Sequence, residues 1–83
     1  MTYVVRLKPS AAKEYAKLPG DVYGRIQAAL VIIAVDPFNG KKLRGQYRDH
    51  YSYRIWPYRI IYQIHKNELL VIIVRIGHRQ GVY

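Results

Sequence analysis

The sequence contains no cysteine, which excludes a disulfide framework and a zinc site built from thiolates. It has only five acidic residues in 83, scattered singly, so it offers no carboxylate cluster that would hold magnesium. No apolar run reaches the ~20 residues that cross a membrane, and the first residues lack the pattern of a secretory signal peptide. We therefore expect a single domain, 1–83, that folds by packing alone, lies in the cytoplasm and uses neither a metal nor a cofactor.

Positive charge, by contrast, is abundant and uneven. The chain holds 14 Lys and Arg against 5 Asp and Glu, a net charge of +9. Residues 1–40 carry a net charge of +2 and residues 41–83 a net charge of +7. Such a bias favours a polyanionic partner, nucleic acid above all, and nine tyrosines would suit unstacked bases. A basic protein that is merely soluble is the alternative.

Two helices are predicted in the first half of the chain, separated by a turn short enough to form an antiparallel hairpin. Ser10 is the expected N-cap of the first helix, 11–18, on which Glu14 faces water. The second helix runs from about Asp21 to Val35 and ends before Pro37. Its apolar stripe consists of Val22, Ile26, Ala29, Leu30 and Ile33.

The later half of this second helix is apolar on every side. Val31, Ile32 and Val35 are therefore surplus to the stripe that one packed face requires. They either pack beneath the loop around Phe38 or form a docking patch for another chain. The sequence leaves both possibilities open.

A basic loop follows at residues 41–48, with four cationic side chains in eight positions around Gly45. This composition is typical of a loop that binds phosphate groups, although a solvated loop is a fair alternative. The cationic residues are Lys41, Lys42, Arg44 and Arg48.

Strands are predicted at residues 3–7 and, from Tyr51 onward, in three further segments whose side chains alternate with a period of two. The final strand, 69–76, is apolar on both faces. If the alternation is regular, four arginines share the sheet face opposite the helices. These are Arg54, Arg59, Arg75 and Arg79. Neighbouring arginines repel and favour an anion between them, unless the surface simply tolerates four exposed arginines.

The last residues combine groups that can bind anions and move protons. Arg79 can stabilise negative charge, while His78 and Tyr83 can transfer protons, and Gly77 and Gly81 allow the backbone to bend. A frayed strand end with a solvated basic tip would show the same composition.

These segments together carry a resemblance to a known family. The chain resembles the RelE/ParE superfamily of type II toxin–antitoxin toxins, and most closely the RelE-like mRNA interferases. The resemblance spans nearly the whole length and rests on the order and spacing of short segments. They are Lys17-Leu18-Pro19, Asp36-Pro37, Lys42-Leu43-Arg44-Gly45, Tyr58-Arg59-Ile60-Ile61-Tyr62 and the ending Gly77-His78-Arg79 with Val82-Tyr83.

The resemblance implies an α+β fold of order β-α-α-β-β-β, with an N-terminal helical hairpin on one face of a small, mainly antiparallel sheet. It also implies a toxin that cuts mRNA in the A site of the 70S ribosome and is held silent by a cognate acidic antitoxin in a hetero-oligomer. The family's functional residues fall on Lys42, Arg44, Arg54, Arg59, Arg79 and Tyr83. Ser52 is a departure, because RelE-like enzymes often carry a lysine there.

The residues suit cleavage by the RNA's own 2′-hydroxyl without a metal. Tyr83 is the predicted base, and Arg59 and Arg79 would stabilise the charge on phosphorus, with Arg54 as a further catalytic residue. Arg75 is expected to bind RNA or the ribosome, as are Lys41, Lys42, Arg44 and Arg48. His78 is a candidate acid, with a structural role for its ring as the alternative. Two other functions stay open: a ParE-like inhibitor of DNA gyrase, and a non-catalytic RNA-binding module. If the surplus residues of the second helix form a docking patch, the antitoxin is expected to bind there.

Overall fold

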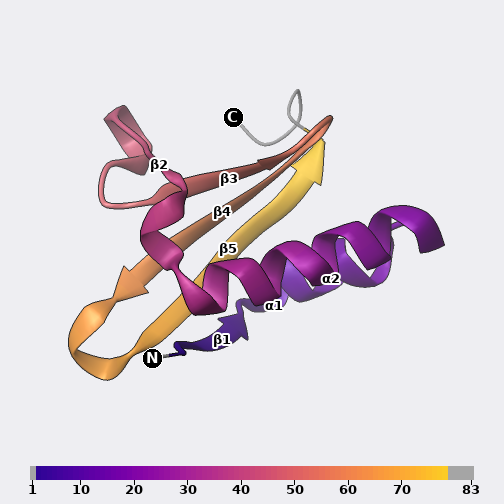
Figure 1. Ribbon diagram of the computed structural model, residues 1–83. Coiled ribbons are helices and arrows are strands. Elements are labelled where there is room, and N and C mark those ends of the chain that lie inside the picture. The colour runs from indigo at the N-terminus through magenta and orange to yellow at the C-terminus, as the bar shows by residue number, and fades with distance from the viewer. Residues whose placement is uncertain (1, 79–83) are drawn as a thin grey trace.

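Two helices pack on one face of a five-stranded sheet in the computed structural model, which describes residues 2–78 (Figure 1). The elements follow in the order β1 (Val4–Leu7), α1 (Pro9–Ala16), α2 (Gly20–Val35), β2 (Lys41–Lys42), β3 (Tyr51–Ile55), β4 (Tyr58–His65) and β5 (Leu70–His78). The strand order across the sheet is β1-β5-β4-β3-β2. Only β1 and β5 run parallel, so the predicted α+β class and the mainly antiparallel sheet are confirmed.

One strand was absent from the sequence prediction. Lys41–Lys42, predicted as the start of a basic loop, forms β2 and pairs antiparallel with β3 at the outer edge of the sheet. Two residues flanked by a turn carry too little alternation to reveal a strand. Its position nevertheless decides where the side chain of Lys41 lies.

The core lies between the helices and the facing side of the sheet. From α2 it receives Val22, Ile26, Ala29 and Ile33, four of the five predicted stripe residues, while Leu30 packs at its margin. The sheet contributes Ile60, Tyr62, Val71, Ile73 and Ile76. Tyr15 and Tyr23 stack with ring centroids 4.2 Å apart, which links α1 to α2. Neither helix within residues 2–78 is both long and apolar enough to cross a membrane.

A bulge in β5 changes which residues face the helices. Ile61 pairs with Arg75, but the next residue of β4, Tyr62, pairs with Ile73, so Val74 has no partner on β4. The extra residue shifts the alternation by one. Ile73 and Ile76 therefore both reach the core although they are three residues apart, and Arg75 falls on the opposite face.

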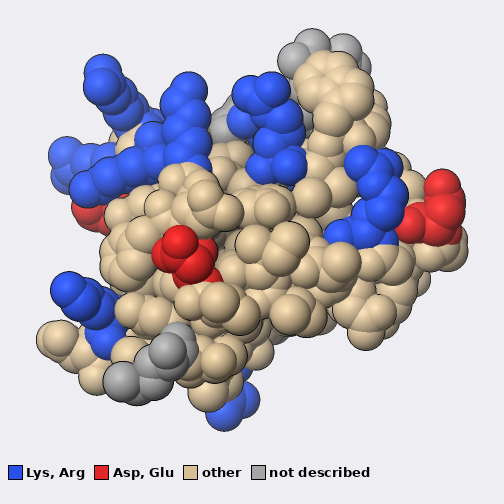
Figure 2. All heavy atoms as spheres, in the orientation of Figure 1, with Lys and Arg blue, Asp and Glu red and all other residues tan. Residues whose placement is uncertain are grey.

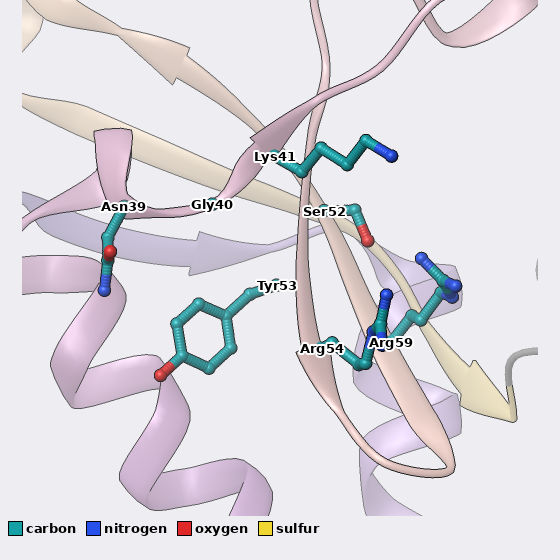
Figure 3. Close-up of a pocket in the computed structure, with 7 residues that line it drawn as sticks. All are labelled: Asn39, Gly40, Lys41, Ser52, Tyr53, Arg54 and Arg59. Carbon is teal, nitrogen blue, oxygen red and sulfur yellow. The ribbon is translucent and has the colours of Figure 1, made fainter.

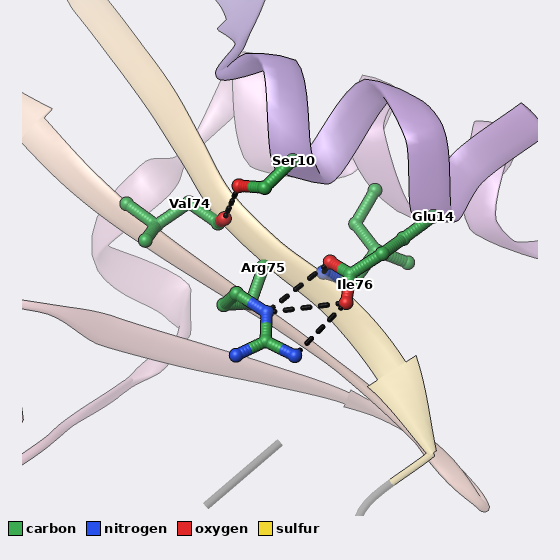
Figure 4. A network of polar contacts seen from close by, with 5 residues as sticks. All are labelled: Ser10, Glu14, Val74, Arg75 and Ile76. Atoms are coloured by element: carbon green, nitrogen blue, oxygen red, sulfur yellow. Dashed lines mark hydrogen bonds and ion pairs between the residues drawn. The ribbon is translucent and has the colours of Figure 1, made fainter. Parts of the chain in front are cut away.

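Helix α1 covers the edge of β5 that β1 leaves open (Figure 4). The Ser10 hydroxyl donates to the carbonyl of Val74 at 3.3 Å, and the carboxylate of Glu14 accepts the backbone N–H of Ile76 at 2.9 Å. The same carboxylate binds the Arg75 guanidinium at 3.0 to 3.3 Å through Nε and Nη2. These hydrogen bonds raise the pKa of Arg75 above its ordinary value. Glu14 is thus a structural anchor rather than the solvent-facing residue predicted.

The start of α1 also differs from the prediction. The helix begins at Pro9, whose fixed backbone angle suits the first turn and whose missing N–H costs nothing there. Lys8 is the N-cap and makes no side-chain cap hydrogen bond. Ser10 lies inside the first turn, and its hydroxyl is used to hold the bulge of β5 instead.

We expect Glu14→Ala to lower the free energy of unfolding by about 1–3 kcal/mol. The substitution leaves the half-buried N–H of Ile76 without its acceptor and Arg75 without its counter-charge. The side chains of Glu14 and Arg75 are 27% and 35% exposed, so solvent screens part of their ion pair. The hydrogen bond to the N–H of Ile76 therefore accounts for most of the expected loss of stability. Urea unfolding measures the loss. The control is Glu68→Ala, whose carboxylate is two-thirds exposed and should change stability by less than about 0.5 kcal/mol.

Candidate functional site

The face of the sheet opposite the helices carries a group of cationic side chains around a small pocket. The pocket has a volume of about 320 Å³ and lies where β2, β3 and β4 adjoin. Figure 3 shows Lys41, Ser52, Arg54 and Arg59 directed to this open side, whereas Asn39 and Tyr53 point the other way. The sequence alternation therefore assigned Arg54 and Arg59 to the correct face.

Arg54 and Arg59 are direct partners across β3 and β4. Residues so paired have their Cβ atoms about 5 Å apart, and like-charged side chains directly opposite one another destabilise a sheet. Arg54 is exposed, and Arg59 is half-buried. An anion between the two guanidinium groups would remove the repulsion and gain charge-assisted hydrogen bonds.

Ser52 lies two residues before Arg54 on the same strand and is 4% exposed. Its Oγ is buried and has no hydrogen-bond partner among the described residues 2–78. Leaving a hydroxyl unpaired in this way costs about 1–3 kcal/mol. In the sequence Ser52 stands out only as a departure from a family pattern, because burial of its hydroxyl depends on the neighbouring strands.

The close approach of β2 to the rest of the sheet depends on Gly40. A side chain at this position would collide with the Tyr62 hydroxyl and press on the backbone carbonyl of Ser52. Tyr62 is fully buried, and its hydroxyl donates to the carbonyl of Pro37 at 2.7 Å. Burial raises the pKa of Tyr62 to about 12, so it remains a neutral donor. This packing holds Lys41 directly opposite Ser52.

Arg75 is placed differently from Arg54 and Arg59. Its pairing with Ile61 puts it on the open face, but its guanidinium reaches the sheet edge and is held by Glu14. Its charge is therefore balanced by a carboxylate, and it is not among the residues that line the pocket. This ion pair could not be predicted from the sequence, because Glu14 is 61 residues away in the chain.

His78 lies on the helix-side face of the sheet, whereas Arg59 lies on the opposite face. It pairs with Tyr58, and their rings meet edge to face with centroids 5.8 Å apart. The strand runs straight through Gly77 to His78, so no bend occurs there. Arg79 and Tyr83, the remaining predicted catalytic residues, lie outside the described residues.

The remaining cations of residues 41–48 form an exposed margin beside the pocket. Lys42, Arg44 and Arg48 are all exposed, on β2 and the turn that follows it. Figure 2 shows Lys and Arg side chains gathered over this part of the molecule, with few acidic groups among them. No three Asp, Glu or His side chains gather into a metal-binding group within residues 2–78.

A second exposed surface lies on α2. Val31, Ile32 and Val35 are 61%, 43% and 62% exposed, so they do not pack beneath the loop around Phe38. Beside Val31, a shallow hollow of about 350 Å³ separates α2 from β1. It is lined mainly by apolar side chains, namely Tyr3, Val5, Leu7, Tyr15, Leu30 and Ala34.

Comparison with known proteins agrees with this geometry. The family described as the ParE toxin of type II toxin–antitoxin system, parDE, matches residues 5–83. Toxin RelG of Mycobacterium tuberculosis is 34% identical over 89 aligned positions, which cover the whole chain and 98% of RelG.

Solved structures show the same fold. The toxin–antitoxin complex RelBE2 from Mycobacterium tuberculosis contains a chain with a TM-score of 0.86 and 30% identity, over 95% of this chain and all of that one. The RelE–RelB complex from Pyrococcus horikoshii gives a TM-score of 0.80 and 27% identity, with both chains covered in full. Since the family match spans all but the first four residues and the relatives align end to end, the chain belongs to the RelE/ParE superfamily of type II toxin–antitoxin toxins.

Proposed function

We propose that this toxin is a metal-independent endoribonuclease that cuts mRNA in the A site of the 70S ribosome, in the cytoplasm. The observation that carries the proposal is the direct pairing of Arg54 with Arg59 on the face of the sheet opposite the helices. Two opposed guanidinium groups can bind a phosphodiester and stabilise the extra negative charge that develops on phosphorus during cleavage. The exposed cations Lys42, Arg44 and Arg48 extend this surface for the neighbouring phosphates and for ribosomal RNA.

Cleavage would use the RNA's own 2′-hydroxyl as the nucleophile. Tyr83 removes the 2′ proton, the 2′ oxygen attacks the adjacent phosphorus, and the 5′ oxygen leaves and takes up a proton. The products are a 2′,3′-cyclic phosphate and a 5′-hydroxyl. A phenol titrates near pH ~10, so forming the phenolate at neutral pH requires roughly 4 kcal/mol. Nearby guanidinium groups favour the phenolate and would supply part of this energy.

Two further tasks, stabilising the charge on phosphorus and protonating the leaving oxygen, need side chains that face the phosphorus. Arg59 and Arg79 stabilise the charge of the pentavalent phosphorus, with Arg54 beside them. His78 is the candidate donor of the proton to the leaving oxygen. Because its ring lies on the helix side, this role requires the chain to turn at Gly77 when RNA binds.

We expect Tyr83→Phe to reduce mRNA cleavage about 100-fold or more, because it removes the proton acceptor and keeps the ring. Arg59→Gln should cause a comparable loss by removing charge stabilisation. Primer extension on mRNA from a reconstituted translation reaction measures the cuts. Tyr3→Phe is the matched control for loss of a tyrosine hydroxyl: Tyr3 precedes β1, at the sheet edge opposite to β2 and the pocket, and the variant should cut normally.

Either of two results would contradict this account. Cleavage at the full rate by Tyr83→Phe would exclude the phenol as the base. No cleavage by the wild-type chain would exclude the ribonuclease function. The second candidate, inhibition of DNA gyrase, is favoured by the ParE family match and would appear instead as lost supercoiling activity in a gyrase assay.

For the partner, we propose a cognate acidic antitoxin that binds α2 and extends toward the cationic face. Several solved relatives are complexes of a toxin with its antitoxin. The exposed side chains of Val31, Ile32 and Val35 offer an apolar stripe to a helix of the antitoxin. Apolar burial would supply most of the affinity, and the +9 charge would speed association with an acidic chain.

The double substitution Val31→Asp/Ile32→Asp should weaken antitoxin binding at least tenfold, because it places two charges in the apolar contact. Isothermal titration calorimetry measures the affinity, and circular dichroism checks the fold. Ala12→Asp/Ala16→Asp adds the same two charges at exposed positions of α1 and serves as the control. Unchanged affinity in the α2 variant would place the antitoxin elsewhere.

A further inference from the structure

The hydroxyl of Ser52 is buried and lacks a protein partner in the described part of the chain. Its Oγ makes no hydrogen bond within residues 2–78, although the residue is 96% buried. The other serine of the chain, Ser10, uses its hydroxyl to hold the bulge of β5. A buried polar atom without a partner is unfavourable to stability and calls for an explanation such as a ligand. In Figure 3 the hydroxyl is directed to the side on which the cations lie.

The pocket that Ser52 lines carries the positive charge that an anion would require. Lys41 lies opposite Ser52 on β2, and Arg54 and Arg59 form the next pair along the sheet toward the β3–β4 turn. None of the seven residues that line the pocket is acidic. Three cations around one hydroxyl match a group that has several acceptor oxygens and more than one neighbouring negative charge, which a phosphate in a nucleic-acid strand provides.

The backbone explains how Lys41 reaches this position. Gly40 allows β2 to pass close to Tyr62 and to the carbonyl of Ser52, where any side chain would collide. The pairing of Lys41 with Ser52 is therefore fixed by packing. Lysine presents a compact charge on a flexible stem, so it can move outward to admit a ligand and then close over it.

We propose that Ser52 and Lys41 form a phosphate subsite for the RNA backbone, next to the Arg54–Arg59 pair. The Ser52 hydroxyl donates a hydrogen bond to a non-bridging phosphate oxygen, and the Lys41 ammonium binds a second oxygen of the same group. The Ser52 hydroxyl thus acquires the partner that it lacks in the free protein. The identity of the ligand as RNA rests on the proposed ribonuclease function, whereas the anion subsite rests on the pocket alone.

Ser52→Ala tests the proposal, and we expect the variant to fold as the wild type does. Alanine fills nearly the same space and removes an unpaired buried hydroxyl, so the variant should be as stable as the wild type or more so. Its affinity for a phosphate group should fall about tenfold, the value of one hydrogen bond to a charged acceptor. Lys41→Gln should weaken binding similarly and reduce the salt dependence by about one phosphate contact.

The probes are inorganic phosphate and a short 2′-O-methyl RNA, which cannot be cut because its 2′ oxygens are blocked. Amide shifts of the full-length ¹⁵N-labelled chain locate and quantify binding of each probe. We expect saturable shifts at Lys41 and Ser52 that weaken in the two variants. Two control variants, Ser10→Ala and Lys66→Gln, change the same residue types outside the pocket and should bind both probes as the wild type does.

Two results would overturn the subsite. One is wild-type affinity in Ser52→Ala, and the other is binding of both probes without shifts at Lys41 and Ser52. The outcome is separate from that of the ribonuclease proposal, because neither probe is cleaved. A chain that shows these shifts but cuts no mRNA keeps the subsite and loses the ribonuclease function. A chain that cuts mRNA while Ser52→Ala binds normally keeps the function and loses the subsite.

Discussion

The helices of this small chain cover only one face of its sheet, and this one-sided packing constrains everything else. The covered face takes the apolar residues of β4 and β5. The other face carries a group of cations, two of them directly paired at Arg54 and Arg59, together with the buried side chains of Ser52 and Ile61. Like charges directly opposite one another repel, and we propose that the same proximity lets both guanidinium groups bind one anion.

Glu14 divides the arginines of the sheet into two kinds. By accepting hydrogen bonds from Arg75 and from the backbone of Ile76, it ties α1 to the edge of β5 and balances one cation. Arg59 on β4 lies one strand further from β5, and Arg54 on β3 lies two strands further. The cationic pocket therefore lies over β2, β3 and β4, and the helices and β5 provide its support.

Much of this arrangement could be predicted from the sequence, because a period of two decides which side of a strand each residue faces. It placed Arg54 and Arg59 correctly, and the helical period identified Val22, Ile26 and Ile33 as core. The predictions that failed concern features that depend on contacts between residues far apart in the sequence. The anchoring of Glu14, the bulge at Val74 and the short strand that sets Lys41 opposite Ser52 arise from packing between segments far apart in the chain.

The repulsion between Arg54 and Arg59 is the central physical claim, and a double-mutant cycle measures it most directly. Arg54→Gln, Arg59→Gln and the double variant give a coupling free energy of unfolding from which the other contacts of each residue cancel. The account predicts a repulsive coupling of roughly 0.2–1 kcal/mol at low ionic strength that shrinks when phosphate is added. A coupling free energy that is zero or attractive, and that does not change when phosphate is added, would contradict the binding of an anion between the two guanidinium groups.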